Sequence, residues 1–213
     1  MRVGILGSGL MGGTLGTVLA RAGHEVVFSF ARSQEKLRRL ARDSRGNARV
    51  GTPREAAKEA DAVILAVHWA HLPEVLELAG DLSSKVIVSC SLPMNEDNTE
   101  LVLGHGTSGA EELARMVPAA RVVSAFNTVP SEVLLGVYNS RRKESPPGMI
   151  YCGDEASSKE TAAALIRSAR FDPVDAGPLR TARYSEPFAL LVARLAYDGR
   201  GGPELAYRFE YFT

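Results

Sequence analysis

The sequence has few cysteines, no long apolar run and no excess of either charge. Two cysteines in 213 residues cannot form a disulfide scaffold, so we expect a reducing, cytoplasmic compartment. No apolar run approaches the roughly 18 residues that a membrane span requires. Lys and Arg together number 25, as do Asp and Glu. This balance argues against a nucleic-acid or membrane-surface partner, because a protein that binds such a partner carries an excess of basic residues.

What the sequence does contain is an alternation of strand and helix patterns. Hydrophobic residues make up 45% of the chain, enough for a buried core. Alternating strands and helices predict a mostly parallel sheet with helices on both faces, the doubly wound α/β or Rossmann architecture. Strands are expected at residues 2–6, 25–30, 62–67, 85–89, 121–125, 149–152 and 172–175. Helices are expected at residues 10–22, 33–42, 71–78, 108–116, 157–169 and 180–197.

A glycine-rich turn links the first strand to the first helix. It consists of Gly7, Ser8, Gly9, Leu10, Met11 and Gly12, the pattern G-x-G-x-x-G. The first glycine allows a tight turn, the second lets the backbone approach a pyrophosphate, and the third lets the helix pack closely. The free N–H groups of the helix N-terminus favour an anion. We therefore predict dinucleotide binding. The alternatives are a turn used only for packing and a secretory signal core, which normally lacks patterned glycines.

The end of the second strand distinguishes NADP from NAD. A carboxylate is expected there for the ribose 2′-hydroxyl of NAD. The sequence instead has Arg32 and Ser33, with Lys36 one turn further on. A guanidinium offers two parallel N–H donors to a 2′-phosphate, and Ser33 can cap the next helix and also donate to the phosphate. These residues favour NADP. The alternative is that Arg32 and Lys36 are ordinary surface charges.

The alternation of strands and helices stops after residue 178. We expect residues 1–178 to form the dinucleotide-binding Rossmann domain. Residues 179–213 are too few for an independent substrate domain, so we expect a helical extension that packs on the same domain. The polar, proline-bearing stretch 141–147 predicts an exposed loop.

Three strand ends are expected to face the reactive end of the cofactor, because ligands of such sheets bind beyond the carboxyl ends of the strands. Residues 67–71, 89–93 and 125–128 form a mostly apolar set without lysine or carboxylate. His68 and His71 are the titratable candidates for a proton donor. We favour His71 as a cofactor ligand or helix cap. Because no third ligand follows at helical spacing, a metal site is disfavoured.

Four further residues can be explained by packing or surface exposure instead of by a function. Cys90 is expected to be a small buried residue and not a nucleophile. Trp69 is the sole tryptophan, and it either stacks on a planar substrate or fills the core. His24 and His105 lie beside glycines in turns, where we expect surface residues.

A site without a strong acid suits a conjugated ring as the hydride acceptor. Such a ring takes hydride at carbon and spreads the charge into its own carbonyl and nitrogen system, and solvent can supply the proton later. The protein then needs only to hold two flat rings face to face. We therefore expect no catalytic side chain.

Several segments, in their order along the chain, resemble the coenzyme F420-dependent NADP reductase family. They are GSGLMGG, Arg32 with Lys36, DAVILAVHWAH, VVSAFNTVPSEVL, YCGDE and DAGPLRTARYSEP. The last is the most specific, and it contains Arg183 and Glu186. The resemblance implies a compact Rossmann domain with a short C-terminal extension, usually dimeric. It also implies hydride transfer between NADP(H) and the deazaflavin coenzyme F420 without a catalytic side chain.

The resemblance further implies binding roles for individual residues. Ser8, Gly9, Leu10 and Met11 are expected at the phosphates, and Arg32 with Lys36 at the 2′-phosphate. The nicotinamide is expected near Val67, His71 and Ala125, with His68 counted among the cofactor-binding residues. The deazaflavin cleft is expected to involve the tail after Gly199 together with Trp69, Ser91, Leu92 and Pro93.

Two other functions remain open on the residues alone. One is an NADPH-dependent reductase of a flavin, an imine or another small acceptor, and the other is a nucleotide-binding module without turnover. The sequence does not give the direction of hydride flow. The apolar helix at residues 188–196 is a plausible dimer surface, so a homodimer is expected.

Overall fold

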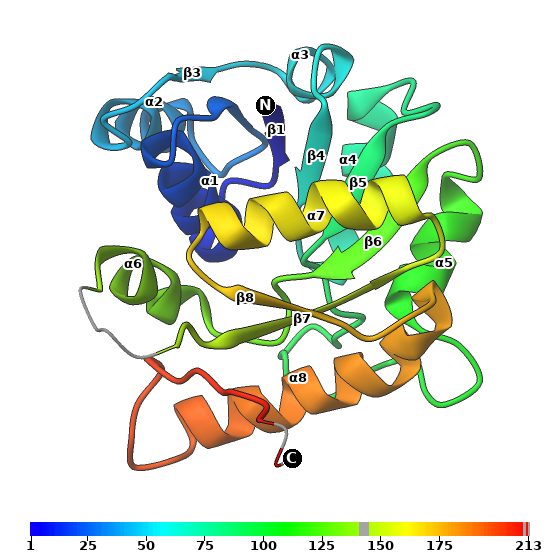
Figure 1. Cartoon of the computed structure of the whole chain (residues 1–213). Coiled ribbons are helices and arrows are strands. Elements are labelled where there is room, and N and C mark those ends of the chain that lie inside the picture. The colour runs from blue at the N-terminus through cyan, green and yellow to red at the C-terminus, as the bar shows by residue number, and fades with distance from the viewer. Residues whose placement is uncertain (141–144, 211, 213) are drawn as a thin grey trace.

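An eight-stranded sheet forms the centre of the molecule in the computed structural model, which describes residues 1–140, 145–210 and 212 (Figure 1). The strands are β1 (Arg2–Leu6), β2 (Glu25–Ser29), β3 (Ala48–Val50), β4 (Ala62–Leu65), β5 (Val86–Ser89), β6 (Arg121–Ala125), β7 (Gly148–Gly153) and β8 (Asp172–Asp175). Their order across the sheet is β3-β2-β1-β4-β5-β6-β7-β8. β1 to β6 are parallel, β7 runs antiparallel to β6, and β8 is parallel to β7. The predicted mostly parallel, doubly wound α/β sheet is confirmed.

The central strands are apolar on both faces because helices cover both faces of a parallel sheet. Every residue of β4 and β5 is buried. In β1, Ile5 is fully buried and lies in register between Phe28 of β2 and Ile64 of β4. This register aligns the carboxyl ends of the three strands at one edge of the sheet, where the glycine-rich turn begins after β1.

Eight α-helices accompany the sheet within the described residues. They are α1 (Leu10–Arg21), α2 (Gln34–Asp43), α3 (Pro53–Lys58), α4 (Leu72–Ala79), α5 (Gly109–Met116), α6 (Ser131–Asn139), α7 (Ala156–Ser168) and α8 (Ala182–Tyr197). Two short 3₁₀ segments, Trp69–His71 and Leu179–Thr181, precede α4 and α8. Apolar residues of α1, α2, α6 and α7 share one buried cluster, and those of α3, α4 and α5 share another. These clusters are the cores on the two faces of the sheet.

Three elements were not expected from the sequence. β3 has only three residues, too few for a visible period. α3 is only six residues long. Its sequence does contain a helix start signal, because Thr52 and Glu55 form a capping box at its N-terminus and Pro53 occupies its first turn. α6 contains Gly136 and has no side-chain cap at Pro130, which weakens its helical pattern. The predicted loop at 141–147 lies partly outside the described residues.

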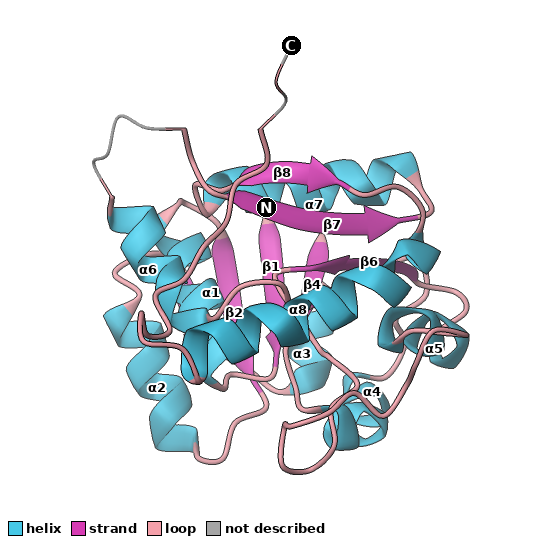
Figure 2. Ribbon diagram, turned by 90° about the horizontal axis from the view of Figure 1, so that it is seen from below, coloured by secondary structure: helices cyan, strands magenta, loops and turns pink. Residues whose placement is uncertain are grey.

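α8 lies across the carboxyl edge of the sheet (Figures 1 and 2). Helices that follow parallel strands begin at this edge, and α8 contacts the start of two of them. Glu186 accepts hydrogen bonds from the first residues of α5, and the Tyr197 hydroxyl donates to Glu132 in α6 at 3.0 Å. Within the part of the chain that the structure describes, no helix is long and apolar enough to cross a membrane.

Candidate dinucleotide and acceptor site

The glycine turn is held against the end of β2 by its own backbone. Gly7 has a φ of 104°, a conformation that only glycine adopts without strain. The N–H of Gly7 donates to Ser29 O at 3.3 Å, and the N–H of Ser8 donates to Phe30 O at 2.9 Å. The Ser8 side chain is fully buried, and its hydroxyl donates to Ser29 O at 2.8 Å. Ser8 therefore shapes the turn, while its hydroxyl is already bonded within the protein.

The other two glycines of the motif have opposite surroundings. A Cβ added at Gly12 would overlap Gly7 O, so the helix packs against the turn as closely as the sequence predicts. A Cβ added at Gly9 would meet no atom within 4 Å, so this face of the turn is open. Gly9 supplies no side-chain cap to α1, and the next residue, Leu10, is 74% exposed. An open turn beside uncapped N–H groups is the arrangement that accepts a pyrophosphate.

The cationic residues predicted for NADP stand at the start of α2. Ser33 is its N-cap, and its hydroxyl accepts a hydrogen bond from the N–H of Lys36 at 3.2 Å, which confirms the predicted cap. Arg32 is exposed, and Lys36 is half-buried. Phe30 has a φ of 53°, so the chain turns sharply before Arg32. Because Phe30 O accepts the N–H of Ser8, the segment that leads to Arg32 starts beside the glycine turn.

Val67 and Ser91 are brought together at the ends of β4 and β5. The Ser91 hydroxyl donates to Val67 O at 2.8 Å. Val67 also packs against the phosphate turn, since a Cβ added at Gly7 would lie 2.6 Å from Val67 Cγ1. The predicted nicotinamide and acceptor residues on these two strands are therefore neighbours. Ala125, at the end of β6, is fully buried, so its predicted place beside the nicotinamide stays a prediction.

His68 caps the 3₁₀ segment, a role that the sequence analysis offered to His71. Its Nδ1 accepts from the N–H of Ala70 at 3.2 Å, and its Nε2 lies 3.2 Å from Asn95 O. A carbonyl oxygen only accepts, so Nε2 is the donor in this pair. Both nitrogens are thus bonded within the protein, which leaves His68 without a free proton to donate.

His71 is exposed and lies on the β2 side of the site. Its ring stands edge-on to Phe30 at 6.3 Å, and its Nδ1 lies 3.4 Å from Glu74 Oε2. It makes no side-chain cap to α4. Trp69 is half-buried and packs against the core cluster beneath α4, so it fills the core with part of its ring and exposes the rest.

Leu92 and Pro93 continue from Ser91 into the long connection before α5. Leu92 is half-buried and Pro93 is buried. Cys90, the residue before Ser91, is also buried, and burial raises the pKa of its thiol to about 12. It is therefore an inert packing residue, as expected. Within the described residues, no group of three or more His, Cys, Asp or Glu side chains converges on a metal-sized site.

Glu186 is the functional candidate whose position the sequence did not predict. It is 2% exposed, and it accepts the N–H of Gly109 at 2.9 Å and of Ala110 at 3.0 Å. Burial raises the pKa of its carboxyl to about 7, and the two N–H bonds oppose that rise. The prediction of strand ends without carboxylates covered only the residues that directly follow the strands in the sequence. Glu186 comes from α8 instead. The DAGPLRTARYSEP segment was the available signal.

The C-terminal tail also reaches the carboxyl edge of β6. The Tyr207 hydroxyl lies 2.7 Å from Thr128 Oγ1 and accepts the N–H of Ile150 at 3.1 Å. Thr128 is part of the segment that follows β6, so the tail contacts one of the three strand ends; its role in an acceptor cleft stays a prediction. No local sequence pattern pointed to Tyr207.

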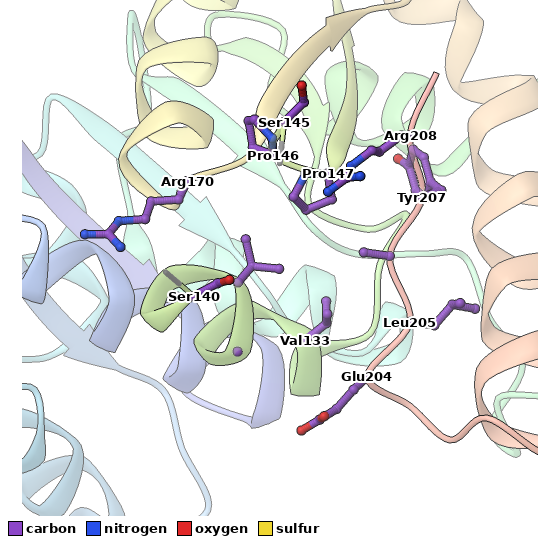
Figure 3. Close-up of a pocket in the computed structure, with 13 residues that line it drawn as sticks. Val133, Ser140, Ser145, Pro146, Pro147, Arg170, Glu204, Leu205, Tyr207 and Arg208 are labelled. Carbon is purple, nitrogen blue, oxygen red and sulfur yellow. The ribbon is translucent and has the colours of Figure 1, made fainter. Parts of the chain in front are cut away.

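A separate cavity of about 710 Å³ lies between α6 and the tail (Figure 3). Val133, Pro147 and Tyr207 are among its lining residues, and Arg170 stands at its rim on the α7 side. Of the predicted cofactor and acceptor residues, only the tail after Gly199 contributes to its lining, through residues 204–208. The candidate dinucleotide site is instead an open surface along the ends of β2, β1 and β4.

His24 differs from its expected surface location. It is 8% exposed, and its Nε2 lies 2.9 Å from Ser168 Oγ at the end of α7. The turn before β2 is covered by α7, which the sequence could not place there. His105 is exposed, as expected.

Comparison with known families agrees with this site. Residues 2–93 match the model of the family described as NADP oxidoreductase, coenzyme F420-dependent. The fold and the glycine turn thus define the class of dinucleotide-binding proteins built on a Rossmann sheet. The N-terminal region of the chain matches the coenzyme F420-dependent NADP oxidoreductase family, and the predicted resemblance is confirmed.

Individual relatives extend the similarity over most of the chain. Metalloreductase STEAP3 of Rattus norvegicus is 32% identical over 190 residues, which are 89% of this chain and 36% of that protein. The F420-dependent NADP reductase of Methanocaldococcus jannaschii is 26% identical over 156 residues, 70% of this chain and 68% of that protein. The chain therefore spans only about a third of the length of the metalloreductase relatives.

A solved structure shows the same fold from end to end. A candidate F420-dependent NADP-reductase from Arthrobacter sp. FB24 has a TM-score of 0.86 at 23% identity, covering 99% of this chain and 100% of that one. The likeness includes α8 and the tail, so the C-terminal arrangement belongs to the shared fold.

Proposed function

We propose that the chain binds NADPH along the carboxyl edge of β2, β1 and β4 and passes its hydride to a planar heterocycle, coenzyme F420 in the first place. Support for the dinucleotide comes from the contrast between an open Gly9 and a closed Gly12. Support for the phosphorylated form comes from Arg32 and Ser33 at the start of α2. The match of residues 2–93 to an NADP-linked family points the same way.

The observation that carries the choice of acceptor is that, among the acids and bases considered at the described strand ends, only His71 keeps a ring nitrogen without a described bond, and it lies on the β2 side of the site. Both nitrogens of His68 are bonded within the protein, the pKa of the Cys90 thiol is raised to about 12, and Glu186 is bonded to α5. A carbonyl or imine reductase places a proton donor beside the reacting carbon. A deazaflavin or flavin does not need one, because the ring holds the added charge itself.

The protein's contribution is then binding and orientation. NADPH supplies the hydride, and the glycine turn and Arg32 fix its phosphates. Val67 and Ser91, joined by their hydrogen bond, form a rigid floor between the two strand ends. Half-buried Trp69 and Leu92 offer apolar surface to a flat ring. Holding the two rings in contact converts the transfer into an effectively unimolecular step.

A flavin is the second candidate acceptor. It is favoured by the 32% identity to a protein described as a metalloreductase. Reduction of a metal requires an electron carrier, and a flavin can serve as one. A flavin and a deazaflavin present the same flat shape to the apolar floor. The two candidates therefore differ in the acceptor and share the NADPH site.

NADPH oxidation at 340 nm tests the proposal. The purified chain is assayed with F420, with FMN, with FAD, and with a ferric chelate plus FMN. Turnover with F420 alone supports the leading proposal, and turnover with the flavins alone supports the second candidate. Tight NADPH binding without turnover of any acceptor contradicts both and leaves a nucleotide-binding module.

We also propose that two copies associate through the outer face of α8. Tyr184, Leu191 and Leu195 are 72%, 55% and 57% exposed, and their spacing puts them on one side of the helix. A dimer would cover this apolar stripe. Light scattering of the wild type and of Leu191→Arg tests it: we expect a dimer and a monomer, respectively.

A further inference from the structure

The start of α5 is a point where three distant segments touch. A Cβ added at Gly109 would lie 2.9 Å from Pro93 Cδ and 3.3 Å from Glu186 Oε1. The segment that leaves β5, the first residue of α5 and the inner face of α8 are therefore in direct contact there. Only a residue without a side chain fits between the proline ring and the carboxylate.

α8 holds the first turn of α5 with two side chains. Glu186 accepts both Gly109 N–H and Ala110 N–H, which have no partner within the helix itself. Arg183 forms a two-bond pair with Glu111, at 2.8 Å and 2.7 Å. Glu186 is buried whereas the Arg183 side chain is one-third exposed, so Glu186 is the stronger arm of this α8–α5 clamp.

The clamp reaches the segment Ser91–Pro93 at Pro93, through Gly109. Pro93 is held by the Val102 N–H, which donates to Pro93 O at 2.7 Å, and by contact with Gly109. At its other end the segment is tied to Val67 through Ser91. The clamp's described bonds are all to α5, and the phosphate turn makes none with it.

We propose that Glu186 is a positioning residue for the hydride acceptor: through Gly109 and Pro93 it sets where Ser91–Pro93 stands, and so determines acceptor affinity without affecting NADPH affinity. The inference rests on the proposed function, because it assigns Ser91–Pro93 to the acceptor. It adds a long-range determinant from the C-terminal helix to a site otherwise built from the sheet.

Glu186→Gln is the direct test, with Glu160→Gln on the exposed surface of α7 as the matched control. Glutamine keeps the size and one accepting oxygen, but its NH₂ group faces an N–H donor, so one bond is lost. We expect the KM for FMN or F420 to rise about tenfold, with NADPH Kd unchanged within about twofold. Kinetics at pH 8 and NADPH fluorescence titration supply the two values, and the control should match the wild type.

Arg183→Lys provides a second variant if Glu186→Gln does not fold. It removes the two-bond geometry of the exposed arm, so a smaller rise of acceptor KM, about threefold, is expected with the same unchanged NADPH Kd. An unchanged acceptor KM in the folded variants overturns the proposal, as does an equal rise of acceptor KM and NADPH Kd.

The proposed function and this inference fail in different ways. If the wild type oxidises NADPH with an acceptor and the variants keep its acceptor KM, only the role of Glu186 is wrong. If the wild type neither turns over nor binds F420, FMN or FAD in a fluorescence titration, both are wrong.

Discussion

The two ends of the candidate site are built by different means. At the dinucleotide end, backbone groups of the glycine turn bond to the end of β2, only 22 residues away in the case of the Gly7 N–H and Ser29 O. At the acceptor end, side chains reach across the fold: Glu186 bonds 77 residues back to Gly109, and Tyr207 bonds 79 residues back to Thr128. A short motif can specify the first end, whereas the second exists only after α8 and the tail have folded.

Replacing glycines in the turn should show how strictly the backbone defines the dinucleotide end. Gly12→Ala puts a Cβ onto Gly7 O, between two backbones that cannot both move. We expect its free energy of unfolding to fall by about 3 kcal/mol, with loss of NADPH binding. Urea denaturation and NADPH titration measure the two effects.

Gly9→Ala is the matched control, because a Cβ there meets no atom within 4 Å. We expect a stability loss below about 1 kcal/mol together with at least tenfold weaker NADPH binding, since the methyl group occupies the approach of the pyrophosphate. Equal stability losses in the two variants would remove the assigned difference between the glycines.

The same contrast explains what the sequence could predict. The positions of most strands, the glycine turn and the Ser33 cap follow from local periodicity, glycine spacing and capping residues, and all three could be predicted. His71 was predicted as a cofactor ligand or helix cap, whereas the structure gives a side-chain cap to His68 and none to His71. The Glu186 contact depends on how α8 crosses the sheet, which no local pattern contains.

The pH dependence of stability should reveal the buried carboxyl at the acceptor end. Burial raises the pKa of Glu186 to about 7 in the folded state, above its ordinary value of 4.5, and the neighbouring Glu111 adds to the rise. Arg183 pairs with Glu111, and Cys152 is the titratable group that faces Glu186 from β7. The folded state therefore holds this proton more tightly than the unfolded state does. The stability it contributes is present at pH 4.5 and is lost as pH rises through 7.

We expect the free energy of unfolding of the wild type, relative to Glu186→Gln, to fall by roughly 2 kcal/mol between pH 5 and pH 8. Urea titrations at several pH values measure it. A difference that grows with pH would mean that the N–H bonds of α5 outweigh burial and that the carboxyl stays ionised.

Cofactor preference tests the dinucleotide end with a smaller effect. Arg32→Ala should weaken NADPH binding about tenfold, or about 1.4 kcal/mol, and leave NADH binding unchanged, because only NADPH carries the 2′-phosphate. Arg38→Ala, an exposed cation one turn further along α2, is the control. Fluorescence titration with both dinucleotides measures the preference. Equal weakening of the two would show that Arg32 contacts another part of the cofactor.

His24 is the exception to the contrast, because it is a long-range side-chain contact in the dinucleotide half. It joins the start of β2 to Ser168, 144 residues away. Burial, followed by the charge of the Met1 amino group, lowers the pKa of His24 below its ordinary value of 6.5. Its stabilisation is therefore present above pH 6.5 and is lost as pH falls through the lowered folded-state pKa.

His24→Gln keeps a donor and an acceptor but does not titrate. We expect the wild type to lose about 1 kcal/mol more than this variant between pH 7 and pH 5 in urea denaturation, with identical NADPH Kd at pH 7. If the stabilities of the wild type and His24→Gln changed with pH in parallel, the His24 ring would titrate equally in the folded and unfolded chains. The contact between His24 and Ser168 would then contribute no pH-dependent stability.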